Sequence, residues 1–137
     1  MSITVKLLLK KDVKKIVSKQ KLFNNPNEKQ FWLQWLGDNN IKAYVLFLND
    51  EAITLALLSK MDFDPIGNHS KPVLINYIYT VEKYRRQKYA SKLIEHIKNR
   101  EEFSAHCDND ASELLFEKSN CSRHDNPINP IYRWPSN

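Results

Sequence analysis

Glycine is nearly absent from this sequence, which has only Gly37 and Gly67 among its 137 residues. Loops that hold phosphate with their backbone usually depend on glycine, because glycine adopts left-handed conformations without strain. The sequence contains no glycine-rich loop of the nucleotide-hydrolase type and no Ser-x-Gly element that presents a nucleophilic serine. These absences exclude the common nucleotide hydrolases and serine hydrolases.

Cysteine is equally scarce, and Cys107 and Cys121 cannot form the disulfide framework of a small secreted domain. Apolar runs are short: Lys6 breaks the N-terminal one, and none approaches the length that spans a bilayer. We therefore expect a cytoplasmic protein with reduced thiols and no membrane partner. We expect no metal site, because neighbouring strand residues such as His106 and Cys107 point to opposite faces.

The charge is moderately unbalanced. The chain carries 21 lysines and arginines against 16 aspartates and glutamates, a formal net charge of +5. Such a charge favours phosphate-bearing or acidic partners, although it also serves solubility. The length is that of one ordinary domain with its own core, so we expect a single domain over residues 1–137.

Hydrophobic periodicity predicts alternating strands and helices. Alternating or continuous apolar runs indicate strands, and apolar residues spaced three and four apart indicate helices. The expected strands are Ile3–Leu7, Lys42–Leu48, Ala52–Leu58, Val73–Tyr79 and Phe103–Cys107, with a last edge strand at Ile131–Trp134. The expected helices begin near Asp12, after the cap residue Asn25, near Ala90 and at Asp110, and the last ends near Lys118. The expected fold is α/β with a mixed sheet, because strand, helix and strand from Val73 to Cys107 form a parallel βαβ unit.

Two of the expected helices carry apolar residues that we assign to the core. The second helix presents Phe31, Trp32 and Trp35 on one face. The last helix presents Ala111, Leu114 and Leu115, after a capping-box pattern that begins at Asp110.

A basic turn, Tyr84–Tyr89, joins the strand Val73–Tyr79 to the helix after Ala90. A turn at this place directs unpaired backbone N–H groups and up to three cationic side chains toward the start of a helix. These donors and the helix dipole form an anion site that fits a phosphate.

Two motifs carry a resemblance to a known family. After the leader Ile78–Thr80, Arg85, Lys88 and Ala90 stand where the first motif has arginine or glutamine, then glycine, then glycine or alanine. The second motif is an asparagine followed by a short helix with a Tyr-Glu-Lys type step, represented here by Asn109, Ser112, Phe116, Glu117 and Lys118. With both motifs at the expected distance, almost the whole chain resembles the GNAT superfamily of N-acyltransferases.

The resemblance implies a GNAT fold of the order β-α-α-β-β-β-α-β-α with a further strand. It implies transfer of an acetyl group from acetyl-coenzyme A (acetyl-CoA) to a primary amine of a small molecule or protein. By the same resemblance, backbone N–H groups from Arg86 to Ser91 hold the pyrophosphate, and the pantetheine arm pairs with the strand near Ile78–Thr80. The implied cofactor-binding residues are Ile78, Tyr79, Thr80, Arg85, Arg86, Gln87, Lys88, Tyr89, Ala90, Ser91, Asn109 and Phe116.

Lys88 and Phe116 depart from the family pattern. Because Lys88 replaces a glycine, the backbone either avoids positive φ there or bears a strain of roughly 1–2 kcal/mol. Phe116 replaces a frequent tyrosine, whose hydroxyl is thought to protonate the departing thiolate, and phenylalanine has no such proton. General acid–base catalysis contributes roughly 10²–10⁴ in rate, so its loss slows a well-positioned reaction without abolishing it.

Other side chains are candidates for the proton transfers. The candidate general acids are Tyr79, Cys121 and Tyr132, and the candidate bases are His106, Asp62, Asp64 and Glu113. Histidine is the side chain that ordinarily titrates near neutral pH, so His106 leads the bases, with a structural, hydrogen-bonded histidine as the alternative.

Three functions remain open at this point. The first is an N-acetyltransferase, whose acceptor amine would lie against the second helix, the hairpin and the Met61–Lys71 loop. The second is a weakly active or inactive GNAT-fold module that binds acyl-CoA or a protein partner, which Lys88, Phe116 and the scarcity of glycine favour. The third, nucleic-acid binding through the basic turn, is not favoured. A homodimer through the proline-rich C-terminal segment is also compatible with the sequence.

Overall fold

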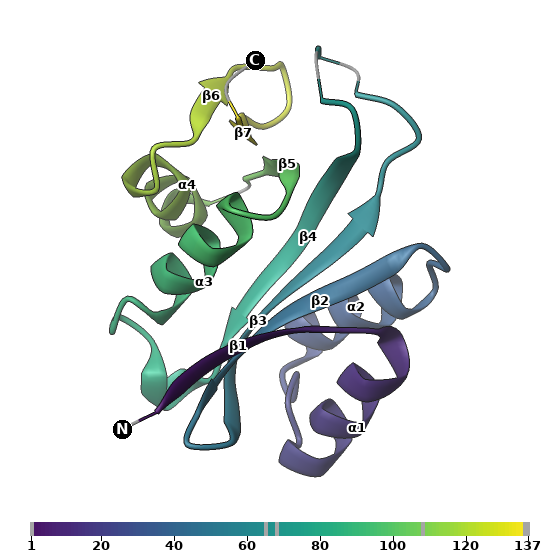
Figure 1. The fold of residues 1–137 in the computed structure, drawn as a ribbon, viewed down its shortest axis with the longest axis vertical. Helices are drawn as coiled ribbons and strands as arrows, with labels where there is room; N and C mark the ends of the chain where they lie inside the picture. The colour runs from purple at the N-terminus through teal and green to yellow at the C-terminus, as the bar shows by residue number, and fades with distance from the viewer. Residues whose placement is uncertain (1, 65, 68, 108, 136–137) are drawn as a thin grey trace.

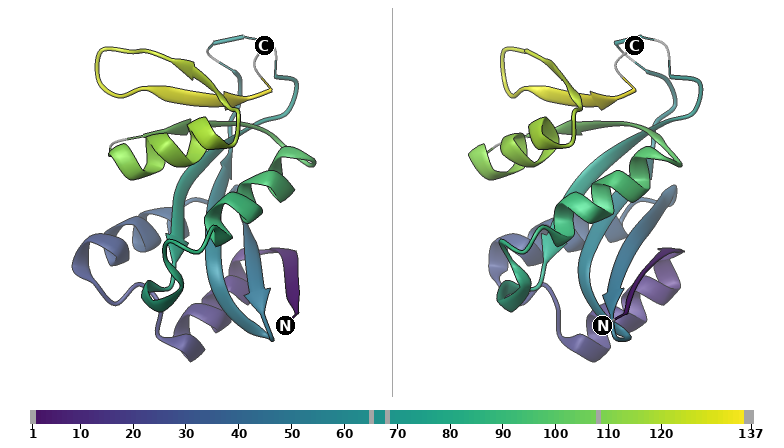
Figure 2. Two further views of the ribbon diagram at one scale, coloured as in Figure 1. Left: turned by 90° about the vertical axis from the view of Figure 1, so that its left-hand side faces the viewer. Right: turned by 60° about the vertical axis from the view of Figure 1, so that its left-hand side comes forward.

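The computed structural model describes residues 2–64, 66–67, 69–107 and 109–135. These residues form one mixed sheet with two helices on each face (Figures 1 and 2). The strands are β1 (Ile3–Leu8), β2 (Ile41–Leu48), β3 (Glu51–Lys60), β4 (Pro72–Thr80), β5 (Glu102–His106), β6 (Ser122–His124) and β7 (Ile131–Trp134). The helices are α1 (Lys10–Gln20), α2 (Pro26–Leu36), α3 (Tyr89–Lys98) and α4 (Asp110–Lys118), with a short 3₁₀ helix at Glu82–Tyr84. The predicted α/β class is therefore confirmed.

The sheet order among the described residues is β1-β2-β3-β4-β5-β7-β6. Only β4 and β5 pair in parallel, so the predicted βαβ unit through α3 is confirmed. The predicted edge position of Ile131–Trp134 is wrong, because β7 lies between β5 and β6. The short, polar strand β6 forms the edge instead, and it has no apolar run by which sequence periodicity could detect it.

Each face of the sheet has its own core. On one face, α3 buries Leu93, Ile94 and Ile97 completely, as its periodicity predicts. Burying each such side chain stabilises the fold by roughly 1.5–3 kcal/mol. On the other face, α1 and α2 contribute Val13, Val17, Trp32 and Trp35 to the second core.

Helix α4 packs differently from the prediction. Ala111 and Leu114 are exposed, and Phe116 is the buried residue of this helix. The Phe116 ring lies 6.2 Å from the ring of Phe103 and 6.0 Å from that of Tyr132. The aromatic contact orients α4, and so its predicted apolar stripe turns partly to solvent.

The strands β4 and β5 separate halfway along β4. They pair only from Pro72↔Glu102 to Ile75↔Ala105, whereas β4 continues to Thr80. The β3–β4 register also shifts at this point, because Leu58 pairs with Ile75 and Leu57 with Tyr77. Asn76 is therefore the extra residue of a β-bulge, which bends a strand and changes the face of the side chains that follow. The edge of β4 beyond the bulge has no β5 partner.

Side chains confirm this change of face. Ile75 belongs to the core under α3, whereas Tyr77 and Tyr79 pack into the core under α1 and α2. The bulge at Asn76 therefore determines which side chains of β4 face each side of the sheet.

Candidate functional site

The open edge of β4 presents backbone groups of Ile78 and Thr80. The N–H of Val81 donates to the carbonyl of Ile53 at 2.9 Å and so faces β3. Because successive peptide groups of a strand alternate in direction, those of Ile78 and Thr80 face the opposite, open edge. The Thr80 carbonyl accepts a 2.7 Å hydrogen bond from Arg85 Nε. An extended ligand can therefore pair with β4 at Ile78 as a further strand would.

The turn that follows β4 ends at the start of α3. Its residues Arg86 and Lys88 have left-handed φ angles of 66° and 67°, with Gln87 between them. The first backbone N–H of α3 that finds an intrahelical acceptor is that of Lys92, which donates to Lys88 O at 3.1 Å. Left-handed residues alternating with others create concave groups of N–H donors that bind anions. The turn and the first helical turn together form such a group.

No side chain in the described part of the chain caps this helix, whereas two other helices are capped. Asn25 accepts from the N–H groups of Asn27 and Glu28 at the start of α2. Asn109 accepts from the Ser112 N–H at 2.8 Å, so it, and not the predicted Asp110, caps α4. The N–H groups of residues 89–91 are therefore left for a ligand, since the first turn of a helix supplies no acceptors for them.

The sequence allowed Lys88 either to avoid positive φ or to bear strain, and the structure shows positive φ. With φ 67° and ψ 15°, the residue has a left-handed backbone conformation, which glycine adopts without strain. A lysine in this shape bears a strain of roughly 1–2 kcal/mol. The turn thus keeps its form despite the substitution, and the lysine side chain is exposed.

Among the cations of the turn, Arg85 is bound to residues outside the turn. Its Nη2 donates to Glu28 Oε2 at 2.9 Å, and its guanidinium lies over the ring of Tyr79 at 5.8 Å. Arg86 and Lys88 are exposed, and Gln87 donates to the carbonyl of Lys83. The exposed cations beside the N–H concavity are therefore Arg86 and Lys88, and Arg85 ties the turn to α2.

Two of the candidate acids are core side chains. Tyr79 is 7% exposed, its ring centroid lies 4.4 Å from that of Phe23, and burial together with Glu28 raises the pKa of its hydroxyl. Cys121 is 8% exposed on the α3 side, where burial raises the pKa of its thiol to about 11. Both groups therefore hold their protons at neutral pH.

The third candidate acid, Tyr132, lies in a polar network at the end of α4. Its hydroxyl donates to Glu117 Oε1 at 2.7 Å, and burial together with this acceptor raises its pKa to about 12. Arg123 forms ion pairs with Glu113 and Asp125, at 2.9 Å each. The candidate base Glu113 is thus already paired.

His106 lies at the point where the strands separate. It is the last residue of β5, one position beyond the final β4–β5 pair Ile75↔Ala105, and its side chain is exposed. Asn76, also exposed, is the residue of β4 that follows the same pair. Cys107 is buried, as expected for a neighbour on the opposite face of a strand.

Asp64 is held inside the protein. Its carboxylate accepts two 2.6 Å hydrogen bonds from Arg133, whose side chain is fully buried, and this pairing keeps the pKa of Asp64 far below its usual range. The Met61–Lys71 loop precedes β4, and so it lies at the other end of that strand from the basic turn (Figure 1). Asp64 therefore serves the fold, and only Asp62 of this loop has an exposed carboxylate.

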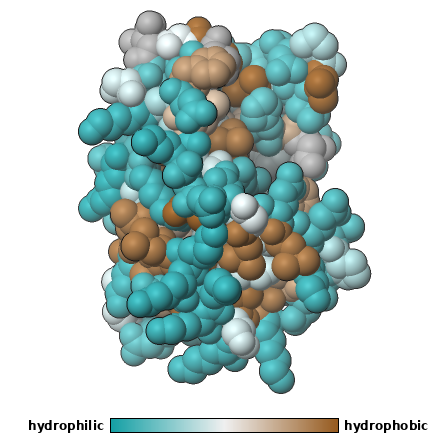
Figure 3. Space-filling view, turned by 90° about the vertical axis from the view of Figure 1, so that its right-hand side faces the viewer, coloured by the Kyte–Doolittle hydropathy of each residue, from teal (hydrophilic) through white to brown (hydrophobic). Residues whose placement is uncertain are grey.

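An aromatic surface flanks the open part of β4 on the α2 side. Phe31 is 37% exposed and stacks on Tyr77, with ring centroids 4.6 Å apart and planes 6° apart. Figure 3 shows the right-hand side of the molecule in Figure 1, where apolar patches lie among mostly hydrophilic side chains. The core position predicted for Phe31 is therefore only partly correct, and the sequence pattern did not point to Asn76 or Glu28. The one signal for Asn76 was a polar residue within an apolar strand.

Among the described residues, no three or more His, Cys, Asp or Glu side chains come together in a way that could hold a metal ion. No helix in the described part of the chain is long and apolar enough to cross a membrane.

Comparisons with known proteins identify a family. The model of the acetyltransferase (GNAT) family matches residues 11–120. Among curated proteins, sequence comparison gives no match. Solved structures with a similar fold include NAA60 of Arabidopsis thaliana in complex with acetyl-CoA, with a TM-score of 0.66, 13% identity and coverage of 97% of this chain and 98% of that one.

Aminoglycoside acetyltransferases are also similar. The 6′-N-acetyltransferase AAC(6′)-Ig of Acinetobacter haemolyticus has a TM-score of 0.62, 17% identity and coverage of 91% of this chain and 94% of its own. AAC(6′)-Iy, in complex with a bisubstrate analogue, has a TM-score of 0.66, 13% identity and coverage of 93% and 96%. At these identities the likeness shows the fold.

Proposed function

Because this chain belongs to the acetyltransferase (GNAT) family, we propose that it transfers the acetyl group of acetyl-CoA to a primary amine. The observation that supports this proposal is that the open edge of β4 and the N–H concavity before α3 are adjacent in the structure. The unpaired edge of β4 leads directly into the N–H concavity at the start of α3. One ligand with an extended arm and a pyrophosphate fits both.

The residues present fit acetyl-CoA in charge and in hydrogen-bonding groups. Backbone N–H groups of residues 86–91 are assigned to the pyrophosphate, with Arg86 and Lys88 adding positive charge. The peptide groups of Ile78 and Thr80 are assigned to the pantetheine arm. Two other residues implied by the family pattern are assigned structural roles in α4: Asn109 caps the helix, and Phe116 is its buried ring.

Acetyl-CoA supplies an activated thioester when it is bound. The Ile78 N–H faces the open edge, where it can donate to a carbonyl oxygen held beside β4. His106, at the separation of the strands, is assigned the role of accepting a proton from the acceptor amine. Tyr79 and Cys121 are assigned structural roles, since both are buried with raised pKa values.

The acceptor amine is assigned to the α2 side of the separation, beside Asn76 and the Phe31–Tyr77 stack. This surface shares the second helix with the one expected from the sequence but does not include the Met61–Lys71 loop, which lies at the far end of β4. The similar aminoglycoside acetyltransferases are named for small-molecule acceptors, and a small amine or an exposed protein amine fits an open surface of this kind.

A thermal-shift titration with acetyl-CoA tests the binding step. At a hundredfold excess over Kd, mass action stabilises the protein by about 2.7 kcal/mol, which raises Tm by roughly 8–12 °C. Ser91→Glu places a carboxylate on the third residue of α3, where it favours the free helix but repels a phosphate. Ser91→Gln is the matched neutral control.

We expect the wild type and Ser91→Gln to show the shift and Ser91→Glu to lose it. The absence of any wild-type shift at millimolar acetyl-CoA contradicts the proposal.

The second candidate, a GNAT-fold module without turnover, is favoured by Phe116, which brings no hydroxyl to the site. Release of coenzyme A thiol with a panel of primary amines distinguishes the two. Amine-dependent thiol release supports the enzyme, whereas binding without turnover across the panel supports the module.

A further inference from the structure

One helix of this protein is strongly positive. Residues 10–21, which comprise α1 and its C-cap, contain six lysines and one aspartate, so their formal charge of +5 equals that of the whole chain. The remaining residues contain 15 of the 21 lysines and arginines and 15 of the 16 aspartates and glutamates, so their formal charges sum to zero. The segment 10–21 is therefore one of two strongly positive segments; the other is residues 83–92, with five cations and no acid.

The packing of α1 turns Lys11, Lys14, Lys15 and Lys19 to solvent, whereas Lys10 donates to the carbonyl of Leu36 at 2.9 Å. Val13 and Val17 bury the opposite side of the helix against the sheet. Four of the lysines, together with Ser18, line a shallow hollow of about 530 Å³; they are Lys11, Lys14, Lys15 and Lys19. Within the described parts of the chain, no ion pair joins a lysine of α1 to a carboxylate.

These charges repel one another in the free protein. Lysines four residues apart lie on the same side of a helix, and α1 has three such pairs, namely Lys10–Lys14, Lys11–Lys15 and Lys15–Lys19. Like charges at this spacing destabilise a helix. A polyanion bound along this face relieves the repulsion, so its binding and the stability of α1 are coupled.

The composition of this lysine face selects the class of partner. The centre of a protein–protein interface is depleted in lysine and rich in aromatic residues and arginine. Helix α1 is rich in lysine and has no aromatic residue and no arginine. Helices that lie on membranes insert an apolar side, whereas the apolar side of α1 is buried in the protein. Single-stranded nucleic acids need aromatic stacking platforms, which α1 also lacks. Lysine contacts to duplex phosphates require none of these.

We propose that the lysine face of α1 binds the phosphate backbone of double-stranded nucleic acid without sequence preference. The dimensions agree. Eight residues separate Lys11 from Lys19, which is about 12 Å along the helix. Over that length a duplex carries about seven phosphates, of which about half face one side. This number matches the four lysines.

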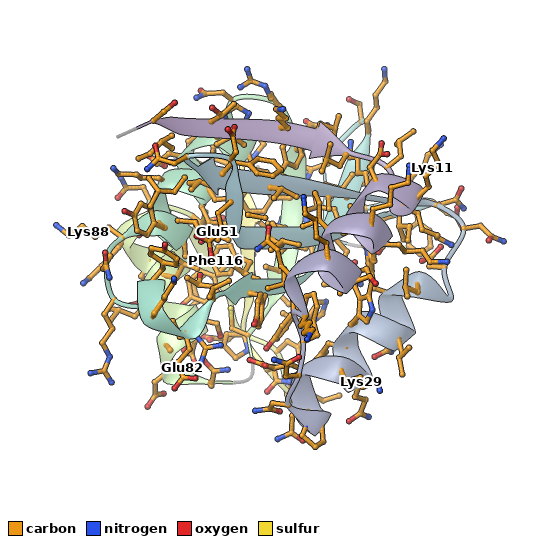
Figure 4. All side chains as sticks on the ribbon, turned by 90° about the horizontal axis from the view of Figure 1, so that it is seen from below. Lys11, Lys29, Glu51, Glu82, Lys88 and Phe116 are labelled. Carbon is orange, nitrogen blue, oxygen red and sulfur yellow. The ribbon has the colours of Figure 1, made fainter. Side chains whose placement is uncertain are left out.

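The proposed surface is separate from the proposed acetyl-CoA site. α1 and α3 cover opposite faces of the sheet, and Figure 4 shows Lys11 and Lys88 at opposite sides of the molecule. The duplex and acetyl-CoA therefore bind at the same time, and this inference does not rest on the proposed acetyl transfer. The nucleic-acid binding that the sequence did not favour concerned the basic turn, which is not part of this surface.

Fluorescence anisotropy with two unrelated 20-base-pair duplexes tests the proposal. With four phosphate contacts, the logarithm of affinity falls with the logarithm of salt concentration at a slope of about −3.6. Binding therefore weakens roughly 150-fold between 50 and 200 mM NaCl, equally for both sequences. In the triple variant K11Q/K14Q/K15Q we expect the slope to fall to about −0.9.

The triple variant K60Q/K71Q/K118Q is the matched control, since it removes the same charge from exposed positions away from α1. It should keep the wild-type slope. An unchanged Tm for both variants, or a higher one for K11Q/K14Q/K15Q, shows that folding is intact.

Several results overturn the proposal. These are equal losses in the two triple variants, displacement of the duplex by saturating acetyl-CoA, and tighter binding of a 20-nucleotide single strand than of the duplex. Binding of polyglutamate or of anionic lipid vesicles in preference to the duplex also overturns it, in favour of an acidic protein or a membrane.

Discussion

Arg85 and Glu28 form a 2.9 Å ion pair that joins the turn after β4 to the first turn of α2. Fifty-seven residues separate them in the chain. The same arginine holds the Thr80 carbonyl at the end of the open edge. Arg85, which the family pattern places beside the pyrophosphate, therefore stabilises the turn in the free protein by binding Glu28 and Thr80.

This pairing predicts that Arg85 and Arg86 contribute differently to cofactor affinity. Arg85→Gln should weaken acetyl-CoA binding by no more than about fivefold, since a partly exposed ion pair contributes roughly 0–1 kcal/mol. Arg86→Gln should weaken it about 10-fold, because a charge-assisted hydrogen bond contributes roughly 1.5–3 kcal/mol. Isothermal titration calorimetry measures both. A larger loss for Arg85→Gln than for Arg86→Gln would show that Arg85 leaves Glu28 to bind the ligand.

Lys88→Gly separates the shape of the turn from its charge. Glycine accepts φ 67° without strain but increases the entropy of the unfolded chain, so the free energy of unfolding should change by less than about 1 kcal/mol. Acetyl-CoA binding should weaken by about two- to fivefold, through loss of one cation near a helix N-terminus. Chemical denaturation and calorimetry check the two effects. Tighter binding in Lys88→Gly would mean that the lysine side chain obstructs the site.

Phe116→Tyr restores the family's tyrosine at a position that is only 3% exposed. The ring lies between Phe103 and Tyr132, so the new hydroxyl loses water without an evident partner. We expect a loss of about 1–3 kcal/mol in the free energy of unfolding and no increase in kcat. Urea denaturation and a thiol-release assay measure these quantities. A tenfold increase in kcat would place the ring beside the thioester in the working enzyme.

His106→Gln should lower kcat by about 10²-fold and leave KM nearly unchanged, if His106 accepts the proton of the acceptor amine. The acidic limb of the pH–kcat profile should flatten in this variant. His124→Gln is the control, because His124 pairs with Ile131 from the other side of β7 and is not at the separation of β4 and β5. A fall in stability with an unchanged pH profile would instead assign His106 a structural role.

Asp64→Asn should destabilise the fold by about 3–5 kcal/mol at pH 7, because it leaves the charge of buried Arg133 without its carboxylate. Arg133 holds the pKa of Asp64 far below its ordinary value, so the unfolded chain takes up this proton first as the pH falls. The stabilisation is complete above roughly pH 5 and is lost progressively toward the lower, folded-state pKa.

Denaturation curves of the wild type and Asp64→Asn should therefore converge between about pH 5 and pH 2. Asp62→Asn, two residues away and exposed, should change the free energy of unfolding by less than about 0.5 kcal/mol. A constant difference between wild type and Asp64→Asn across this pH range would exclude the linkage.

Features that depend only on neighbouring residues in the chain are predictable from the sequence. The spacing of Leu93, Ile94 and Ile97 predicts α3 and its buried face, and Asn25 with Pro26 predicts the start of α2. The basic turn between a strand and a helix also predicts an anion site, because helix dipoles and unpaired N–H groups are local properties. The family motifs lie in these same local segments.

Contacts between segments that are distant in the chain become visible in the folded protein. Arg85 meets Glu28, Asp64 meets Arg133, and β7 inserts between β5 and β6. Each of these pairings depends on how the sheet closes, and many partners with the same chemistry were available in the sequence. The bulge at Asn76 is the clearest case: a single extra residue separates β4 from β5 and creates the edge that leads to α3. Periodicity describes a strand but does not specify where its partner stops.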